Sequence, residues 1–571
     1  MRQVNKYSLI AAGACLWTAQ VGGQNSSVKK QGDTRPNIIV ILADDLGFSD
    51  VGCYGSEINT PNIDRLASQG VKITQLYNAG RSCPSRACLL TGLYPHQTGL
   101  GHMDGHGPAW PIGYRGFRSE SDNVTIAEVM RSAGYYTAMS GKWHLGKNVD
   151  PVSRGFEDYF GMLGGFGSYW DPSIYTRLPQ GSPEREYPQG TFYSTNVITD
   201  YAIDFAANAQ KQGKPLFLYL AYNAPHFPLH APKEVIDKYM PIYQKGWDVI
   251  RDERFARMRK LGILQGDPQM SPRGDVPQSM FIDQAHPIPA WNSLSVEQQT
   301  DLARRMAVFA AAVDVMDTNI GRFIDALRKS GQLDNTLIIF TSDNGACAEW
   351  QEFGFDGKTG LDYHTHVGAE LDQMGLPGSY LHYGTGWANV GCTPFVLYKH
   401  YTHEGGISSP SLIWWGGHLV KPGRIDYDPL HITDIMATCV DYGRATYPAT
   451  YDGRKILPME GQSLRPVIED KTMPSRTIFG EHEGNRMVRE GDWKLVSTYY
   501  NHDRWELYNI REDRTEQHDL AAQYPDKVKA LAAEYKIWAA RCDVLPFAPM
   551  WNKYSAPGQY KFPIYDDDTD Q

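Results

Sequence analysis

Four short apolar segments restrict what this chain can fold into. Each is rich in β-branched or aromatic residues, is bounded by Gly, Pro or polar residues, and is hydrophobic at consecutive positions, as is typical of strands covered on both faces. They are residues 37–45 (NIIVILADD), 134–144 (GYYTAMSGKWH), 215–226 (PLFLYLAYNAPH) and 335–345 (NTLIIFTSDNG). Helical patterns lie between them, as in NIDRLASQG and TIAEVMRSAG. This alternation predicts an α/β fold with a large, mixed but mostly parallel sheet sandwiched by helices.

Polar residues lie at the C-terminal end of each apolar segment. They are Asp44 and Asp45, Lys142 and His144, His226, and Asp343 and Asn344. Ligands of open α/β sheets bind at the carboxyl edge of the strands, so we expect these side chains to meet there. The alternative is that each polar group caps a strand end facing solvent. Capping is a reasonable explanation for any one of these residues, but a poor one for the whole set.

Four of these residues offer only oxygen as a ligand atom: Asp44, Asp45, Asp343 and Asn344. Carboxylates and an amide carbonyl favour a hard cation, with Ca²⁺ as the first choice and Mg²⁺ as the second. The candidate cationic side chains around them are Arg86, Lys142, His144, His226 and Lys399. A hard metal surrounded by cations suits an anionic oxo group whose charge must be neutralised as a bond to oxygen breaks.

The segment AGRSCPSRACLLTGLYPH holds several hydroxyl and thiol side chains. Pro84 suits the first turn of a helix, so Ser82 is expected near a helix N-terminus, where anions are favoured. Ser82 and Arg86 are four residues apart and can share a helical face, whereas Cys83 and Cys88 point elsewhere. The alternative is that Ser82 or Cys83 is only a helix cap. The spacing favours Ser82 acting with Arg86.

The pattern Ser-x-Pro-x-Arg from Ser82 to Arg86, followed by LTG, resembles the signature of type I, formylglycine-dependent sulfatases. The motifs DDLG, GKWHLGK, APH, SDNG and Lys399 before a Gly-Gly pair follow in that family's order, and GWANVGCTPFVLYKHYTHEGG looks most like its bacterial arylsulfatase-like branch. The resemblance implies an alkaline-phosphatase-like fold and sulfatase activity. Sulfatases of aerobes usually carry Cys at the first position. Ser82 therefore resembles the serine type of anaerobic bacteria, which an anaerobic sulfatase-maturating enzyme oxidises.

The resemblance also implies a role for each site residue. Ser82 becomes a formylglycine that binds one Ca²⁺ together with the residues Asp44, Asp45, Asp343 and Asn344. Its hydrate attacks sulfur, His226 protonates the leaving alcohol, and His144 takes the proton of the second hydroxyl as sulfate leaves. The groups that hold the sulfate and the cofactor are Arg86, Lys142 and Lys399.

The expected substrates are O-sulfated monosaccharide units of host or algal glycans, with small aryl sulfates as the alternative. Loop residues that could face a sugar are His102, His286, Trp291, Trp387 and Asn389. A phosphomonoesterase or phosphonate monoester hydrolase of the same superfamily is the second candidate, although such phosphatases generally hold two zinc ions. A sulfoglycan-binding protein without catalysis is the third, and the filled catalytic positions argue against it.

The N-terminus predicts export. A short basic region precedes an apolar run that is shorter than the roughly 20 residues needed to span a bilayer, which predicts a signal peptide over residues 1–23 and a periplasmic or secreted protein. Cys15 is an alternative site for a lipid anchor, and no later segment predicts a transmembrane helix. The net charge of -10, without a basic stripe, argues against nucleic acid as a partner.

The chain divides by composition into two expected domains. Residues 34–470 carry the strand and helix alternation and the site, with a polar, Pro-rich insertion at about 236–300 that is typical of a lid or binding insertion. Residues 471–571 predict a smaller α+β domain, in which an antiparallel sheet carries one helix.

Overall fold

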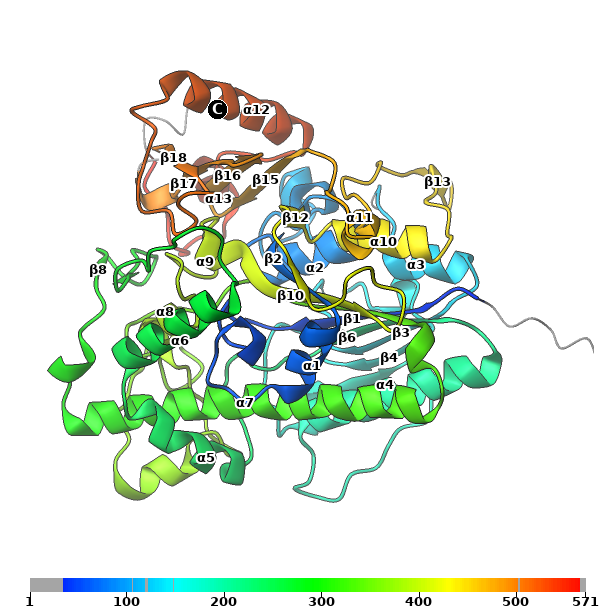
Figure 1. Ribbon diagram of the computed structural model, residues 1–571, viewed down its shortest axis with the longest axis horizontal. Helices are drawn as coiled ribbons and strands as arrows, with labels where there is room; N and C mark the ends of the chain where they lie inside the picture. The colour runs from blue at the N-terminus through cyan, green and yellow to red at the C-terminus, as the bar shows by residue number, and fades with distance from the viewer. Residues whose placement is uncertain (1–33, 105, 119–121, 147, 502–503, 565–571) are drawn as a thin grey trace, which may run out of the picture. The chain divides into compact units, whose positions relative to one another are not determined.

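In the computed structural model, which describes residues 34–564 apart from 105, 119–121, 147, 502 and 503, ten strands form a central sheet (Figure 1). The four apolar segments are adjacent and parallel at its centre, in the order β9 (Thr336–Ser342), β1 (Asn37–Ala43), β6 (Leu216–Ala221) and β3 (Tyr136–Gly141). The other strands are β2 (Val71–Tyr77), β4 (Asp158–Gly161), β5 (Thr176–Leu178), β10 (Ser408–Trp415), β11 (Arg424–Asp426) and β12 (Leu430–His431).

The sheet is mixed, as expected. β10 runs antiparallel to both β9 and β2, and β5 runs antiparallel to β4. The remaining pairs are parallel. The predicted fold class is therefore confirmed, and the carboxyl ends of β9, β1, β6 and β3 lie next to one another.

Helices cover both faces of the sheet, which explains why the strands are apolar at consecutive positions. Ile39 and Ile41 of β1 pack in one buried cluster, and Ile38 and Val40 pack in another. The first face is covered by α1 (Pro61–Gln69), α4 (Ser194–Gln212) and α7 (Val296–Lys329). The second is covered by α2 (Ser82–Thr91), α3 (Ile126–Ser132) and α10 (Asp434–Tyr442).

The predicted insertion contains regular structure that its sequence pattern does not suggest. Its elements are α5 (Lys233–Tyr243), α6 (Trp247–Leu261), β7 (Asp275–Val276) and β8 (His286–Pro287). The buried face of α6 carries Arg254, which is fully buried and pairs with Asp50 at 2.5 Å and Glu57 at 2.7 Å. Because charged pairs occupy this inner face, the helix lacks the apolar periodicity that reveals most helices.

A second, antiparallel sheet follows near the C-terminus, as expected. It is built from β15 (Thr477–His482), β16 (Asn485–Glu490), β17 (Trp493–Ser497) and β18 (Glu506–Asn509). The helix α12 (Pro525–Arg541) packs on it through Leu531, Tyr535 and Trp538 (Figure 1). The expected domain boundary near residue 470 falls between α11 (Arg465–Ile468) and β15.

The predicted signal peptide at 1–23 and Cys15 lie outside the described residues. Among the helices of the described part, none combines the length and apolar character that crossing a bilayer requires. The seven cysteines of that part are all free thiols.

Candidate active site

Two parallel strands place the acidic residues side by side. Ala43, the last residue of β1, is in register with Ser342, the last residue of β9. The residues that follow, Asp44 and Asp343, therefore leave the sheet next to each other, and both are fully buried. Ser82, the first residue of α2, donates its hydroxyl to both carboxylates, at 3.1 Å to Asp44 Oδ1 and 2.7 Å to Asp343 Oδ2.

Arg86 lies one helical turn after Ser82, on the same face of α2. Its Nε and Nη2 atoms donate to Asp343 Oδ2 at 3.0 and 2.8 Å, and its Nη1 atom donates to the carbonyl of Lys142 at 2.8 Å. Lys142, directly after β3, places its Nζ atom 2.6 Å from Asp44 Oδ2. Each acid of the pair is therefore in direct contact with a buried cation.

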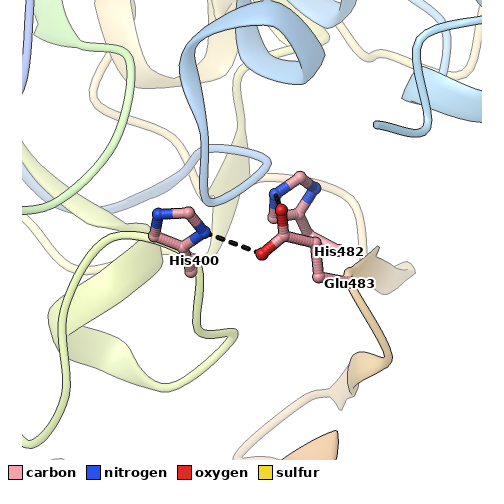
Figure 2. A group of neighbouring side chains, drawn as sticks. All are labelled: His400, His482 and Glu483. Carbon is pink, nitrogen blue, oxygen red and sulfur yellow. Dashed lines mark hydrogen bonds and ion pairs between the residues drawn. The ribbon is translucent and has the colours of Figure 1, made fainter. Parts of the chain in front are cut away.

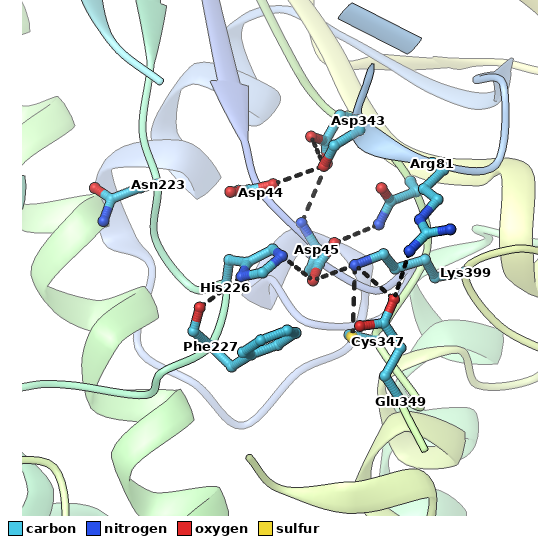
Figure 3. Close-up of polar contacts among 12 residues, drawn as sticks. Asp44, Asp45, Arg81, Asn223, His226, Phe227, Asp343, Cys347, Glu349 and Lys399 are labelled. Atoms are coloured by element: carbon cyan, nitrogen blue, oxygen red, sulfur yellow. Dashed lines mark hydrogen bonds and ion pairs between the residues drawn. The ribbon is translucent and has the colours of Figure 1, made fainter. Parts of the chain in front are cut away.

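Asp45 is the centre of a second group of contacts (Figure 3). Lys399 Nζ lies 3.1 Å and His226 Nε2 3.3 Å from Asp45 Oδ2, and the Asn344 amide donates to Asp45 Oδ1 at 2.6 Å. The backbone of Asp45 has a φ of 64°, in the left-handed region that a non-glycine residue rarely adopts. Such strain often occurs at functional sites, where the surrounding structure enforces it.

The hydrogen bonds of His226 define where its protons are. Its Nδ1 atom lies 2.6 Å from the carbonyl oxygen of Phe227, which can only accept, so Nδ1 carries a hydrogen. A hydrogen bond from Nε2 to Asp45 would then require a second proton, on Nε2. Burial lowers the pKa of His226, and attraction to Asp45 opposes that shift. Its Nε2 atom faces Asp45 and is the ring nitrogen that is open to exchange a proton with a group in the site.

His144 follows Lys142 on the same loop and also has a left-handed backbone, with a φ of 54°. Within the described residues, its buried Nδ1 atom has no hydrogen-bond partner. A Cβ atom at Gly165 would lie 2.4 Å from His144 Nε2, so only glycine leaves room for this ring. Burial, followed by repulsion from Lys142, keeps the pKa of His144 well below its usual value.

The other nucleophile candidates of α2 have structural roles. Cys83 and Cys88 are fully buried in the apolar cluster on the second face of the sheet. The hydroxyl of Ser85 accepts a hydrogen bond from the backbone of Ala79 at 2.9 Å. Ser82 is thus the hydroxyl of this segment that faces the acidic residues.

The donor set fits a hard divalent cation. Asn344 donates both of its amide hydrogens, at 2.6 Å to Asp45 and 2.9 Å to Gly345, while its buried Oδ1 atom has no partner among the described residues. Burial and the charge of Asp44 both raise the pKa of Asp343, so the site gains from further positive charge. The residues that could hold the ion are Asp44, Asp45, Asp343 and Asn344, joined by Ser82.

A cavity of about 300 Å³ opens beside Lys399. Of the loop residues expected to face a sugar, His102 lines it, whereas Trp291, Trp387 and Asn389 are buried and His286 pairs with Glu352 at 3.4 Å, away from the cavity. Those four are not among the residues that line this cavity. Other polar residues, which are not among the candidates predicted from the sequence, also line the cavity: Arg81, Glu349, His400 and Glu483.

Glu349 links the cavity to the site. Its carboxylate lies 3.3 Å from Lys399 Nζ and 2.7 Å from His400 Nε2. Burial raises its pKa, but attraction to Lys399 and hydrogen bonding to His400 outweigh this and keep it well below its usual value. A signal for Glu349 was present in the sequence, since it lies five residues after the SDN motif at the end of β9.

A family model for sulfatases matches residues 36–444, which include the site residues from Asp44 to Lys399. The chain belongs to the sulfatase family. It is therefore a sulfuric ester hydrolase, as the sequence predicts.

Two curated relatives and one solved structure are similar over most of their length. An uncharacterized sulfatase of Schizosaccharomyces pombe is 33% identical, over 90% of this chain and 96% of the relative. An arylsulfatase of Klebsiella aerogenes is 32% identical, over 82% of this chain and 98% of the relative. A crystal structure of Ps i-CgsB in complex with k-i-k-neocarrahexaose has a TM-score of 0.62 at 25% identity, covering 92% of this chain and 98% of that chain.

Proposed function

We propose that this sulfatase hydrolyses O-sulfate esters of monosaccharide units in glycans, through a formylglycine made from Ser82 and one bound Ca²⁺. The observation that carries the proposal is the position of the Ser82 hydroxyl between Asp44 and Asp343, at the start of α2. A group attached to this Cβ atom stands where acidic and cationic side chains converge. Mg²⁺ is the second choice for the ion.

The aldehyde of formylglycine supplies, in its hydrated form, two hydroxyl groups on one carbon. A bound divalent cation supplies positive charge that favours the ionised form of a hydroxyl and offsets the charge of sulfate. The chain's own cations also offset the charge of sulfate. Arg86, Lys142 and Lys399 are buried and hydrogen-bonded, so they are pre-positioned for an oxyanion.

The two histidines are suited to opposite proton transfers: His226 to giving a proton and His144 to accepting one. His226 can deliver the proton on Nε2 to the leaving oxygen, because its Nδ1 atom is held by the Phe227 carbonyl. His144 Nδ1 has no hydrogen-bond partner in the described part of the chain, and the pKa of the ring is low, so a neutral ring is available to accept a proton. A sugar alkoxide is a poor leaving group, which makes a proton donor most valuable for carbohydrate sulfates.

The carbohydrate is preferred over an aryl group because of the cavity beside Lys399, which combines charged and aromatic side chains. The complex of Ps i-CgsB with a neocarrahexaose supports the same class of substrate. The Klebsiella relative is an arylsulfatase, which keeps small aryl sulfates as the alternative. The oxygen-rich donor set disfavours a two-zinc phosphatase.

The proposal includes two further elements. The predicted signal peptide leads to export to the periplasm or beyond, with a lipid anchor at Cys15 as the alternative. The serine at position 82 requires an anaerobic sulfatase-maturating enzyme as a partner during synthesis.

The test uses the full chain produced together with such a maturating enzyme. We expect release of sulfate from 4-nitrophenyl sulfate and from at least one mono-sulfated saccharide among sulfated galactose, N-acetylgalactosamine and N-acetylglucosamine. Turnover of 4-nitrophenyl phosphate at a higher kcat/KM than the sulfate would favour the phosphatase instead. Absence of all turnover with Ser82 fully oxidised would favour a binding protein.

A further inference from the structure

Glu483 has a left-handed backbone conformation, which is unfavourable for a glutamate. It lies in the turn between β15 and β16, where His482 and Asn485 form the last pair of the ladder. The two turn residues, Glu483 and Gly484, both have positive φ values, of 52° and 79°. Such two-residue turns favour Asn, Asp or Gly, and another residue there costs on the order of 1 kcal/mol. We therefore expect the contacts of the Glu483 side chain to offset this backbone cost.

Three cationic or neutral donors converge on the Glu483 carboxylate. Arg81 Nη1 lies 2.5 Å and His102 Nε2 2.9 Å from Oε1, while His400 Nδ1 lies 2.8 Å from Oε2, the contact that Figure 2 shows. Burial raises the pKa of Glu483, but attraction to His400 and Arg81 outweighs this and keeps it well below its usual value. The group is therefore ionised and acts only as an acceptor.

One acceptor position remains on this carboxylate. A carboxylate oxygen can accept about two hydrogen bonds, and among the described residues Oε2 accepts the one from His400. The side chain is 21% exposed and lines the cavity beside Lys399. A ligand in the cavity that donates a hydrogen bond can therefore reach Glu483 without breaking its existing contacts.

A metal ion is a poorer fit for the same place, although His400, His482 and Glu483 lie close enough to share one. The guanidinium of Arg81 is already 2.5 Å from Glu483 and would repel a second cation. His400 is also committed, because its two nitrogens bridge Glu483 and Glu349 at 2.8 and 2.7 Å. The arrangement therefore suits a hydrogen-bond donor better than a cation.

Aromatic side chains also line the cavity. Phe281, from the insertion, lies with its ring centroid 5.0 Å from that of Trp350, and Trp350 lies 5.3 Å from His400. Phe281 is 39% exposed, so part of its ring is open to a ligand in the cavity. A pyranose ring has hydroxyls on its rim and C–H groups on its faces, so it suits a cavity lined by both charged and aromatic side chains.

Arg81 connects this cavity to the reaction centre. It bonds Glu483 and directly precedes Ser82, and Lys399 lines the cavity while its Nζ atom contacts Asp45. A group bound in the cavity is therefore next to the residues that would hold sulfate.

We propose that Glu483 is a specificity-determining residue that accepts a hydrogen bond from a hydroxyl of the sugar leaving group, whose ring packs against Phe281 and Trp350. This inference rests on the proposed function, since it assigns the part of the substrate beyond the sulfate. It makes the tip of the β15–β16 hairpin the element that distinguishes a carbohydrate sulfate from an aryl sulfate.

The test compares wild type, Glu483→Gln and a control, Glu352→Gln, on 4-nitrophenyl sulfate and on the 6-sulfates of galactose, N-acetylgalactosamine and N-acetylglucosamine. Glu352 is also a half-buried acid paired with a histidine, but it lies outside the cavity lining. For the best saccharide, we expect Glu483→Gln to lower the ratio of kcat/KM relative to nitrophenyl sulfate by about 10- to 100-fold, since a charged acceptor is lost. The control should leave this ratio unchanged.

Equal losses on both kinds of substrate would overturn the inference, because Glu483 would then act through Arg81 on the reaction centre. An unchanged ratio would overturn it too, as would a wild type that turns over nitrophenyl sulfate and no saccharide sulfate. If the matured wild type hydrolyses neither, the proposed function itself fails.

Should Glu483→Gln not fold, Phe281→Ala, at a half-exposed position, provides a second test. We expect it to raise the KM for the saccharide sulfate about 5- to 10-fold with a smaller effect on kcat, and an unchanged KM would count against the inference.

Discussion

The hydroxyl of Ser82 lies 2.7 Å from Oδ2 of Asp343, the same oxygen that accepts two hydrogen bonds from Arg86. Ser82 is thus hydrogen-bonded to Asp343, which follows β9 and whose negative charge is already partly neutralised by Arg86. The neighbouring acid, Asp44, is neutralised in the same way by Lys142 at 2.6 Å. Asp45 and Asn344 supply the further oxygen atoms from which we infer a metal.

The first prediction concerns that metal. Chelator-treated wild type should gain thermal stability when Ca²⁺ is added, because an ion that binds only the folded state stabilises it. Asp343→Ala should lose most of this gain and all sulfatase activity, while its far-UV circular dichroism stays native. The measurement is the shift in Tm on Ca²⁺ addition, with Asp248→Ala, a surface carboxylate paired with Arg273, as the control. Stoichiometric zinc in the purified protein by elemental analysis would contradict the assignment.

The second prediction separates acid catalysis from sulfate binding at His226. His226→Ala should lower kcat/KM for a saccharide sulfate by about 10²- to 10⁴-fold, because the alkoxide then leaves without a proton. The loss on 4-nitrophenyl sulfate should be far smaller, since nitrophenolate needs little protonation. His286→Ala, which removes a half-exposed histidine outside the site, is the matched control. A similar loss on both substrates would mean that His226 binds sulfate.

Much of the site was predictable from the sequence because its residues directly follow buried strands. The end of an apolar segment fixes the position of Asp44, Lys142 or Asp343 to within one or two residues, and parallel pairing brings these ends together. Glu483 could not be found in this way. It is 402 residues from its partner Arg81, and its hairpin tip carries no motif of its own. The contact depends on how the C-terminal sheet packs, which local patterns do not encode.

The third prediction concerns stability and pH at Glu404, a fully buried acid that joins the two sheets. Glu404 Oε1 lies 2.9 Å from Lys494 of β17, and Oε2 lies 3.1 Å from Arg514. Burial raises the pKa of Glu404, but attraction to Lys494 and Arg514 outweighs it and lowers the pKa to about 2. The ion pairs therefore contribute stability above the unfolded pKa of about 4.5, and this is lost as the pH falls toward 2.

Glu404→Gln should accordingly lower the free energy of unfolding by about 3–5 kcal/mol at pH 7, because Lys494 and Arg514 both lose a buried negative partner, although Lys494 keeps Glu516 at 2.8 Å. The difference from wild type should shrink at pH 3.5. Urea unfolding of both proteins at the two pH values measures it, with the exposed Glu512→Gln as the control. A difference that is the same at both pH values would show that the loss comes from packing and not from charge.

The last prediction is that Ser82 works only after oxidation. An unmodified serine hydroxyl has a high pKa, and after one attack it would remain sulfated until water released it at sulfur. An aldehyde hydrate avoids this, because its second hydroxyl can expel sulfate as the aldehyde forms again.

Ser82→Ala should therefore be inactive. Ser85→Ala should keep measurable activity, since the Ser85 hydroxyl accepts a hydrogen bond from the backbone of Ala79 and Ser82 is the hydroxyl that contacts the acids. In a host that matures only cysteine-type sulfatases, wild type should be nearly inactive and Ser82→Cys should regain activity. Mass spectrometry of the tryptic peptide that begins at Ser82 should show the loss of two hydrogens in active enzyme. Full activity with an intact Ser82 would refute the formylglycine and favour a serine nucleophile, as in a phosphatase.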